Sequence, residues 1–302
     1  MDPAEVIVVG VDGSAGADAA VRWAAARAGG TGASLRLLYA YPALVPAPGM
    51  PLAATPYRID PDAYAQAAEA VVAAAADLAR QHADHVEVST ALQVGGAGQA
   101  LIDASSAASL VVVGSRGLGG FTGLLLGSVG VQVSAHAHCP TVVVRGDGTP
   151  VAGPVVVGVD GSEPSHAAVG FAFAEASRMH TDLVALHAWQ LPLPGGVGEA
   201  AALALEAGRG REMYEDAARQ MLTDALAPWR DRYRDVPVRQ RTTQGGAAPA
   251  LLTAAERAAM LVVGTRGHGG FAGLLLGCTS HALLQHATCP VAVIRAPSAP
   301  AR

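Results

Sequence analysis

The chain has 302 residues, of which 51% are hydrophobic and 15% are charged, and this composition predicts a globular protein of about two domains. Its formal net charge is −5, so it lacks the clustered basic excess that a nucleic-acid-binding surface needs. All 20 basic residues are arginine, which excludes a phosphate loop built on lysine and also Schiff-base chemistry.

The sequence also predicts a cytoplasmic protein with no membrane or nucleic-acid partner. The first eleven residues lack a basic segment followed by a cleavable apolar one. No stretch reaches the roughly 20 apolar residues that a membrane-spanning helix needs. The three cysteines are too few, and odd in number, for a disulfide framework.

In the first half of the chain, apolar runs that predict buried strands alternate with helical patterns. Ser14 is expected to cap the first helix, which Gly29-Gly30 ends, while Asp60 and Pro61 start the second helix. In chain order we expect strand 6–11, helix 17–28, strand 35–39, a long helix from 61, strand 86–94, helix 99–108, strand 110–113, helix 128–136 and strand 141–144.

Such alternation specifies a parallel sheet with helices on both faces. Ligands of these sheets bind beyond the carboxyl ends of the strands, where the strand order reverses. Two loops in that position carry candidate residues, 12–14 after the first strand and 114–128 after the fourth.

The whole pattern occurs twice. The run VVGVDGS ends at Ser14 and again at Ser162, and GSRGLGGFTGLLLG from Gly114 returns as GTRGHGGFAGLLLG from Gly264. The offset is 148 residues for the first motif and 150 for the second, so the second copy contains two more residues between them, most simply in a loop. A period near 150 fits a duplicated domain and is too long for a solenoid.

We therefore predict an α/β chain with two tandem, doubly wound, parallel five-stranded sheets. The domains are 1–146 and 154–302, and the Gly- and Pro-rich residues 147–153 form the linker. In the second copy we expect strands at 155–159, 183–187, 236–242, 260–263 and 291–294, and a long helix near 199–229.

The glycine-rich loop after the fourth strand has the character of an anion site. Gly114, Gly117 and Gly127 let the backbone approach a phosphate without a Cβ. Ser128 opens the following helix, where its hydroxyl and the backbone amides can donate to a phosphate oxygen. Glycine-rich turns also occur without a ligand, so a simple turn is the alternative.

The motif V-D-G-S after the first strand, combined with G-x-x-G-(nine residues)-G-[S/T] after the fourth, resembles the ATP-binding branch of the universal stress protein family. The resemblance covers essentially the whole chain, twice, including the Cys-Pro pair before each last strand. It implies an adenine-nucleotide α-hydrolase-like fold in both domains, with ATP and Mg²⁺ as cofactors.

The resemblance also implies two sets of cofactor-binding residues. Those of the first copy are Asp12 beside the adenosine, Ala40 at the adenine, Gly114 and Gly117 along the ribose and phosphates, and Gly127, Ser128 and Val129 at the phosphates. The matching residues of the second copy are Asp160, Ala188, Gly264, Gly267, Gly277, Cys278 and Thr279.

Cys278 departs from the motif, which has Ser or Thr at this position. A thiol is a weak donor, so the second site should lose about 1 kcal/mol of binding free energy. We expect weaker ATP binding by the second copy unless Thr279 compensates. Redox sensing by Cys278 is an alternative role, whereas Cys139 and Cys289 are expected to be buried structural thiols.

Each of the other candidate ligand-binding residues has two possible roles. Asp12 and Asp160 can contact the ligand or only stabilise a turn and cap a helix. Arg116 and Arg266 can reach a phosphate or remain in solvent. No cluster of residues at metal-ligand spacing is present, so no metal site on the protein is expected.

No catalytic motif accompanies the glycine loops, since G-x-S-x-G and a phosphate-loop lysine are missing. We expect a nucleotide-dependent regulatory module of the stress response with little or no catalysis. The alternatives are a structural or interaction protein without nucleotide and a slow ATPase. The apolar last strands predict pairing of the two copies within the chain. Members of the family commonly dimerise through this strand, so the resemblance also implies a homodimer.

Overall fold

The computed structural model describes residues 5–41, 61–118, 126–190, 209–267 and 275–296. The chain forms two compact units, Met1–Thr149 and Pro150–Arg302. The boundary falls within the Gly- and Pro-rich stretch expected to link them. Within the described residues, every helix is too short or too polar to cross a membrane.

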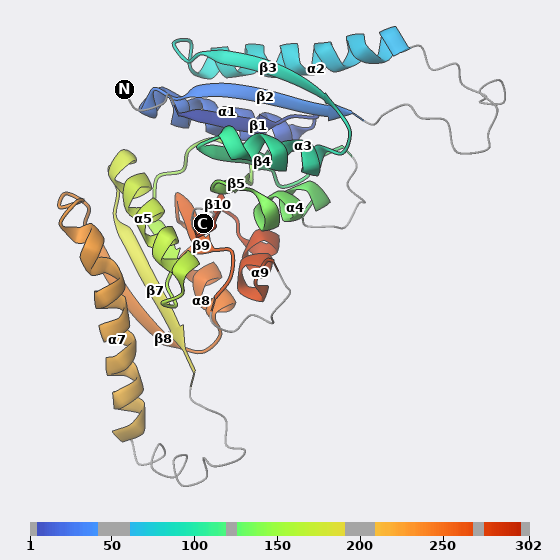
Figure 1. Ribbon diagram of the computed structural model, residues 1–302. Helices are drawn as coiled ribbons and strands as arrows, with labels where there is room; N and C mark the ends of the chain where they lie inside the picture. The colour runs from blue at the N-terminus through green and yellow to red at the C-terminus, as the bar shows by residue number, and fades with distance from the viewer. Residues whose placement is uncertain (1–4, 42–60, 119–125, 191–208, 268–274, 297–302) are drawn as a thin grey trace, which may run out of the picture. The chain divides into compact units, whose positions relative to one another are not determined.

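The first unit alternates strands and helices along its whole length (Figure 1). Its strands are β1 Val6–Gly10, β2 Ser34–Tyr41, β3 Val88–Val94, β4 Leu110–Gly114 and β5 Thr141–Val144. Its α-helices are α1 Ala15–Thr31, α2 Pro61–His82, α3 Ala97–Ala104 and α4 Ser128–His136, and a short 3₁₀ turn, Ser105–Ala107, follows α3.

The five strands form a parallel sheet in the order β3-β2-β1-β4-β5. The central strand β1 is fully apolar except for its terminal glycine and is buried, with Ile7 and Val9 at 0% exposure. Val8 lies opposite Arg36 of β2 on one side and Val111 of β4 on the other. The chain winds outward from β1 to β3 and then returns to β4, so the strand order reverses between β1 and β4.

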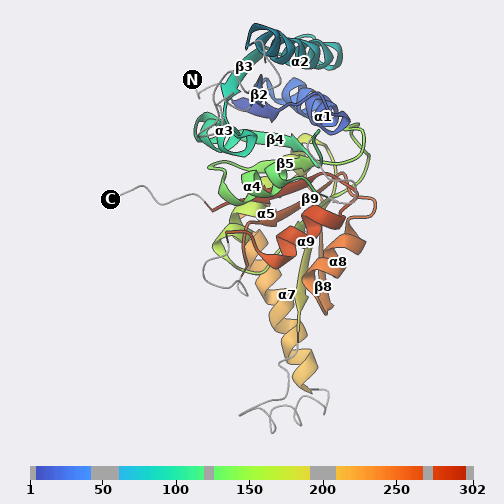
Figure 2. The same cartoon turned by 90° about the vertical axis from the view of Figure 1, so that its right-hand side faces the viewer.

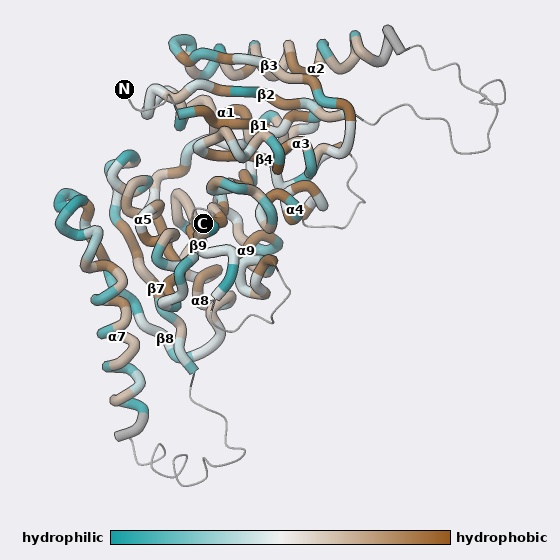
Figure 3. Tube along the Cα trace, in the orientation of Figure 1, coloured by the Kyte–Doolittle hydropathy of each residue, from teal (hydrophilic) through white to brown (hydrophobic). Residues whose placement is uncertain are grey.

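Helices cover both faces of this sheet. The helices α1 and α2 pack together on one face, and α3 and α4 pack together on the other. Figure 2 shows α1 and α3 on opposite sides of the strands, and Figure 3 shows the hydrophobic residues concentrated along β1. Alanine dominates the buried face of α1, which lets this helix lie close to the sheet.

The second unit repeats this architecture. Its strands are β6 Val155–Gly158, β7 Leu183–Trp189, β8 Val238–Gln244, β9 Met260–Gly264 and β10 Val291–Ile294, in the parallel order β8-β7-β6-β9-β10. Its helices are α5 Glu163–Arg178, α7 Arg209–Arg230, α8 Ala247–Ala254 and α9 Cys278–His286. The α/β class and the two parallel five-stranded sheets predicted from the sequence are confirmed.

The first helix does not end at Gly29-Gly30, as the sequence suggested, and that prediction is wrong. The helix α1 continues to Thr31, and Gly32 ends it in the left-handed conformation with φ 72°. Its N–H donates to the carbonyl of Ala28 at 2.9 Å. Gly29 lies inside the helix, and its carbonyl oxygen is 3.4 Å from Nε2 of His85.

Other element boundaries also differ from the prediction, and β3, for example, begins at Val88 instead of residue 86. The third helix begins at Ala97 instead of Gln99, and its last turn is a 3₁₀ turn. The strand β8 begins at Val238, two residues later than expected, because the N–H of Val236 turns back to the carbonyl of Tyr233. The cap at Asp60 and the helix residues 199–208 lie outside the described part of the chain.

Candidate functional site

The turn after β1 is formed by Asp12, Gly13 and Ser14. Gly13 has φ 80°, a conformation that favours glycine, and it reverses the chain between strand and helix. The Asp12 carboxylate accepts the Ser14 N–H at 3.0 Å, and the Ser14 hydroxyl accepts the N–H of Ala17 at 3.1 Å. Ser14 is therefore the cap of α1, as predicted.

The start of α1 also touches the loop after β4, about one hundred residues later in the chain. A Cβ on Gly16 would lie 2.2 Å from the carbonyl oxygen of Arg116, and a Cβ on Gly114 would lie 2.4 Å from the backbone of Gly16. The Ser14 hydroxyl donates to the Arg116 carbonyl at 3.3 Å. Only glycines at 16 and 114 allow these two backbones to approach so closely.

Asp12 holds the glycine-rich loop in place. Its second carboxylate oxygen accepts the N–H of Leu118 at 2.8 Å. A Cβ on Gly117 would lie 2.3 Å from that oxygen, so a side chain at 117 would displace either the loop or the carboxylate. Asp12 thus has the turn-stabilising role that the sequence left open, and it also faces the cavity beside it.

The helix α4 begins at this loop with its amides uncapped by any described side chain. Its N-cap is Gly127, whose N–H donates to the Ser115 carbonyl at 2.8 Å. Ser128 is exposed, and Val129 is partly exposed. The first-turn N–H groups carry the positive end of the helix dipole, and they lie at the edge of the cavity.

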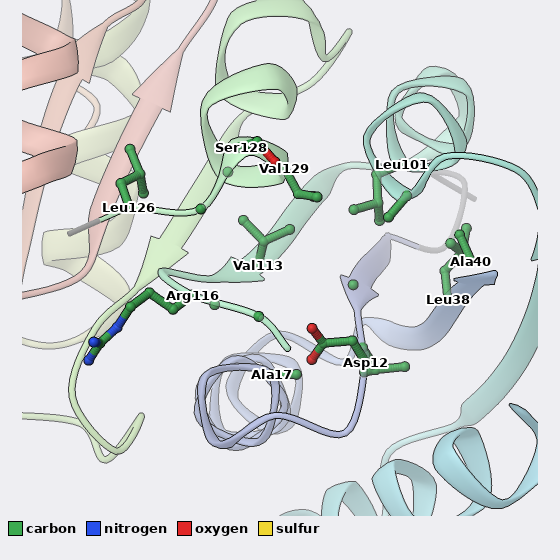
Figure 4. A pocket seen from close by; sticks show the side chains of 17 residues that line it. Asp12, Ala17, Leu38, Ala40, Leu101, Val113, Arg116, Leu126, Ser128 and Val129 are labelled. Carbon is green, nitrogen blue, oxygen red and sulfur yellow. The ribbon is translucent and has the colours of Figure 1, made fainter. Parts of the chain in front are cut away.

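A cavity of about 400 Å³ lies at the carboxyl ends of β1, β2 and β4, where the strand order reverses. This volume falls in the range of small-molecule sites, about 300–1,000 Å³. Figure 4 shows Leu38, Ala40 and Leu101 at one side of the cavity and the Asp12 carboxylate pointing toward the glycine loop. In the same view the Arg116 guanidinium points away from Asp12.

All seven residues that the sequence singled out in the first copy line this one cavity. They come from four separate segments of the chain: Asp12, Ala40, the pair Gly114 and Gly117, and the run Gly127, Ser128 and Val129. The structure therefore brings together residues that are up to 117 positions apart in the sequence.

Sequence reasoning missed the apolar wall of the cavity. Leu38 lies in the second half of β2, Val113 lies near the end of β4, and Ala97 and Leu101 belong to the first turns of α3. An available signal was the pair Gly95-Gly96 just before α3, which returns before α8 in the second copy. This pair forms the turn between β3 and α3, which lies at the same edge of the sheet as the turns after β1 and β4.

The second unit contains a matching but smaller cavity of about 170 Å³. All seven predicted residues of the second copy line it: Asp160, Ala188, Gly264, Gly267, Gly277, Cys278 and Thr279. Gly161 repeats the positive φ, at 81°, and a Cβ on Gly267 would collide with the Asp160 carboxylate. The turn and loop geometry is thus the same in both units.

The thiols differ in their surroundings. Cys278 is exposed, Cys289 is buried and Cys139 is partly buried. Burial raises the pKa of the Cys139 thiol to about 12, so it is neutral at physiological pH. Within the described ranges, no three His, Cys, Asp or Glu side chains are grouped closely enough to hold a metal ion.

The fold and the two cavities define a tandem, doubly wound α/β protein with a pocket at the topological switch point of each sheet. The model of the universal stress protein family matches residues 4–145 and 152–295. The chain therefore belongs to the universal stress protein family.

Its relatives agree with this assignment. A universal stress protein of Mycolicibacterium smegmatis is 40% identical over 294 residues, which cover 96% of each chain. One of Mycobacterium tuberculosis is 38% identical over 315 residues, covering 98% of this chain and 96% of that protein. The crystal structure of a universal stress protein from Archaeoglobus fulgidus shares the fold, with a TM-score of 0.64 and 19% identity over 96% of this chain and 98% of that one.

Proposed function

We propose that this chain binds ATP in the cavity of its first unit and acts in the cytoplasm as a nucleotide-dependent regulatory module of the stress response, with little or no catalysis. The observation that carries the proposal is the convergence of seven predicted residues, from four segments, on one cavity of about 400 Å³. Such a cavity at a switch point is the usual ligand site of this fold class.

The two ends of the cavity suit the two ends of a nucleotide. Leu38, Ala40 and Leu101 form an apolar surface against which a purine can pack. At the other end, Gly117 and Gly127 expose main chain without side chains, next to the uncapped start of α4. Backbone amides at a helix N-terminus are a site for phosphate groups.

Mg²⁺ would enter with the nucleotide. This ion usually keeps several waters and is held by phosphates together with one or two carboxylates. The described residues offer no cluster of three ligand side chains, while Asp12 lies at the cavity edge with both oxygens already accepting backbone N–H groups. The phosphates of the nucleotide would therefore provide most of the ligands of the ion other than water.

A regulatory role requires ATP to bind one conformation better than another. The glycine loop is the segment through which this can happen, because Asp12 holds Leu118 on one side of the cavity and α4 begins on the other. A phosphate that contacts both segments would favour the arrangement in which they are close together.

The proposal is tested by titrating the full chain with Mg·ATP in a calorimeter and by mass spectrometry of nucleotide released on denaturation. Gly117→Ala should weaken ATP binding by about tenfold, because its Cβ would displace the Asp12 carboxylate and the loop. Gly96→Ala is the matched control, since a Cβ there meets nothing within 4 Å and φ is −76°.

The same experiment separates the alternative functions. A chain that binds no ATP and releases none on denaturation would be a structural or interaction protein, and the proposal would be wrong. Steady-state phosphate release well above background that disappears in Gly117→Ala would instead identify an ATPase.

We further propose that the two units pair through β5 and β10, and that the chain forms a homodimer. Each sheet has one polar and one apolar edge strand. The outer strands β3 and β8 carry polar residues such as Thr90 and Arg239, which suit contact with water. The opposite strands β5 and β10 are almost entirely aliphatic.

A further inference from the structure

The two cavities share their apolar end. Five apolar residues of the first cavity recur unchanged at the matching positions of the second: Leu38, Ala40, Ala97, Leu101 and Val113 correspond to Leu186, Ala188, Ala247, Leu251 and Val263. A ligand part that packs against this wall in one unit therefore meets the same side chains in the other.

At the glycine-loop end the two cavities differ in their lining residues, and the first difference is Ser280. Its counterpart in the first cavity is Gly130, which has no side chain. The Ser280 hydroxyl donates to the carbonyl of Gly264 at 2.7 Å, and the residue is 4% exposed. This hydroxyl occupies space beside the glycine loop, and its proton is already used by the protein.

Ser165 is the second difference between the two cavities. Its counterpart in the first cavity is Ala17, and its hydroxyl accepts the N–H of Asp160 at 3.1 Å. The Asp160 carboxylate also accepts the Ser162 hydroxyl at 2.6 Å, a bond that the structure gives for the second unit. The second cavity thus carries the hydroxyl groups of Ser165 and Ser280 where the first cavity has the methyl group of Ala17 and the hydrogen of Gly130.

The cavity with the additional hydroxyl groups is also the smaller one, with about 170 Å³ in the second unit against about 400 Å³ in the first. Because the five apolar residues named above are identical, the loss of space is assigned to the glycine-loop end, where Ser165 and Ser280 replace Ala17 and Gly130. Cys278 further replaces the hydroxyl of Ser128 by a weak donor at the start of the helix.

We propose that the second cavity binds a nucleoside monophosphate, AMP, in preference to ATP. The inference rests on the proposal that adenine nucleotides occupy these cavities, and it assigns them by phosphate number. ATP would then occupy the first unit and AMP the second, so that one chain would respond to both nucleotides.

Two full-length variants isolate the cavities. Ala40→Phe fills the apolar end of the first cavity, and Ala188→Phe does the same at the matching position of the second; both alanines are partly exposed at the ends of their strands. Each variant is titrated with Mg·ATP and with AMP by calorimetry, after circular dichroism shows that its unfolding temperature matches that of the wild type.

The Ala188→Phe chain should bind ATP more tightly than AMP, and the Ala40→Phe chain should bind AMP at least tenfold more tightly than ATP. Adding Ser165→Ala and Ser280→Gly to Ala40→Phe should shift that preference at least tenfold toward ATP. An unchanged preference in this triple variant would overturn the assignment to the two serines.

The inference fails if the Ala40→Phe chain prefers ATP or binds neither nucleotide while the Ala188→Phe chain binds ATP. In that case the proposed function stands. Conversely, if the Ala188→Phe chain binds no ATP but the Ala40→Phe chain prefers AMP, the proposed function fails, while the preference of the second cavity for AMP stands. Photolabelling of the unmodified chain with 8-azido-ATP and 8-azido-AMP, followed by peptide mapping, tests the same assignment without any cavity-filling variant. The ATP probe should label the first unit and the AMP probe the second.

Discussion

Asp12 is the residue on which the local geometry of the first site depends. One carboxylate oxygen holds the turn after β1 and the other holds the loop after β4, so a single side chain joins two segments 106 residues apart. Its position at the cavity edge makes ligand contact compatible with this structural role. The sequence presented these two roles as alternatives.

Replacing Asp12 by Asn tests the structural role. An amide keeps one acceptor oxygen and presents an NH₂ group to the other N–H, so Asp12→Asn should lower the free energy of unfolding by about 1–2 kcal/mol. Urea unfolding measures the loss. The control is Asp77→Asn, which breaks an exposed pair with Arg80 and should change stability by less than about 0.5 kcal/mol. Equal effects of the two variants would contradict the proposed clamp.

Cys139 predicts a pH dependence at alkaline pH. Burial raises its pKa from 9.0 to about 12 in the folded chain, so the unfolded chain loses this proton first as the pH rises. The stability due to the neutral thiol is fully present below pH 9 and declines between pH 9 and 12. The difference in unfolding free energy between wild type and Cys139→Ala should therefore shrink between pH 8 and pH 11, measured by urea unfolding.

The same surroundings predict selective alkylation. Cys278 is exposed and should react with iodoacetamide in the native chain well before Cys139 and Cys289. Peptide mass spectrometry reads out the labelled residue, and labelling in urea, where all three thiols should react, is the control. Faster native labelling of Cys289 than of Cys278 would contradict the burial found here.

At the scale of the elements, the two units use the same cap with different strengths. Ser14 caps α1 by accepting the N–H of Ala17 and donates to the Arg116 carbonyl at 3.3 Å, while Ser162 caps α5 by accepting the N–H of Ser165 at 3.4 Å and donates to Asp160 at 2.6 Å. Ser162 is 9% exposed. The second cap is therefore tied to the turn before it as well as to its own helix.

Removing the caps should reveal this difference. Ser14→Ala should cost about 1 kcal/mol, the usual value of a serine cap, and Ser162→Ala should cost more because its hydroxyl donates to the Asp160 carboxylate, whereas that of Ser14 donates to a neutral carbonyl. For units of about 150 residues, each kcal/mol lowers the unfolding temperature by about 2–4 °C. Calorimetric scans of the two variants measure the shifts, and a larger loss for Ser14→Ala would contradict the comparison.

At the scale of the whole molecule, the apolar strands β5 and β10 and the polar strands β3 and β8 predict which edges associate. Light scattering should give a mass of about twice the chain's 30.3 kDa for the proposed homodimer. A mass equal to one chain at concentrations up to the millimolar range would refute the homodimer, although pairing within the chain would be unaffected.

The sequence alone determined the elements and their repetition. Apolar runs such as 110–113 predict buried strands, and Asp-Gly-Ser after a strand predicts a turn and a helix cap, because these preferences depend on neighbouring residues. The family motif then placed Gly114, Gly117 and Gly127 at one edge of the sheet. Element ends followed less directly from the sequence, since α1 continues through Gly29 and Gly30 and ends at Gly32, the residue that adopts the left-handed conformation.

Only the tertiary structure decided how these loops meet and how much space they leave. The contact between Gly16 and Arg116, the bond from Leu118 to Asp12 and the wall formed by Leu101 join residues that lie far apart in the chain and obey no local period. The two cavities likewise differ in volume, about 400 and about 170 Å³, although the motifs around them nearly repeat. Sequence patterns act over a few neighbouring residues, whereas a cavity is the volume left after distant segments have packed.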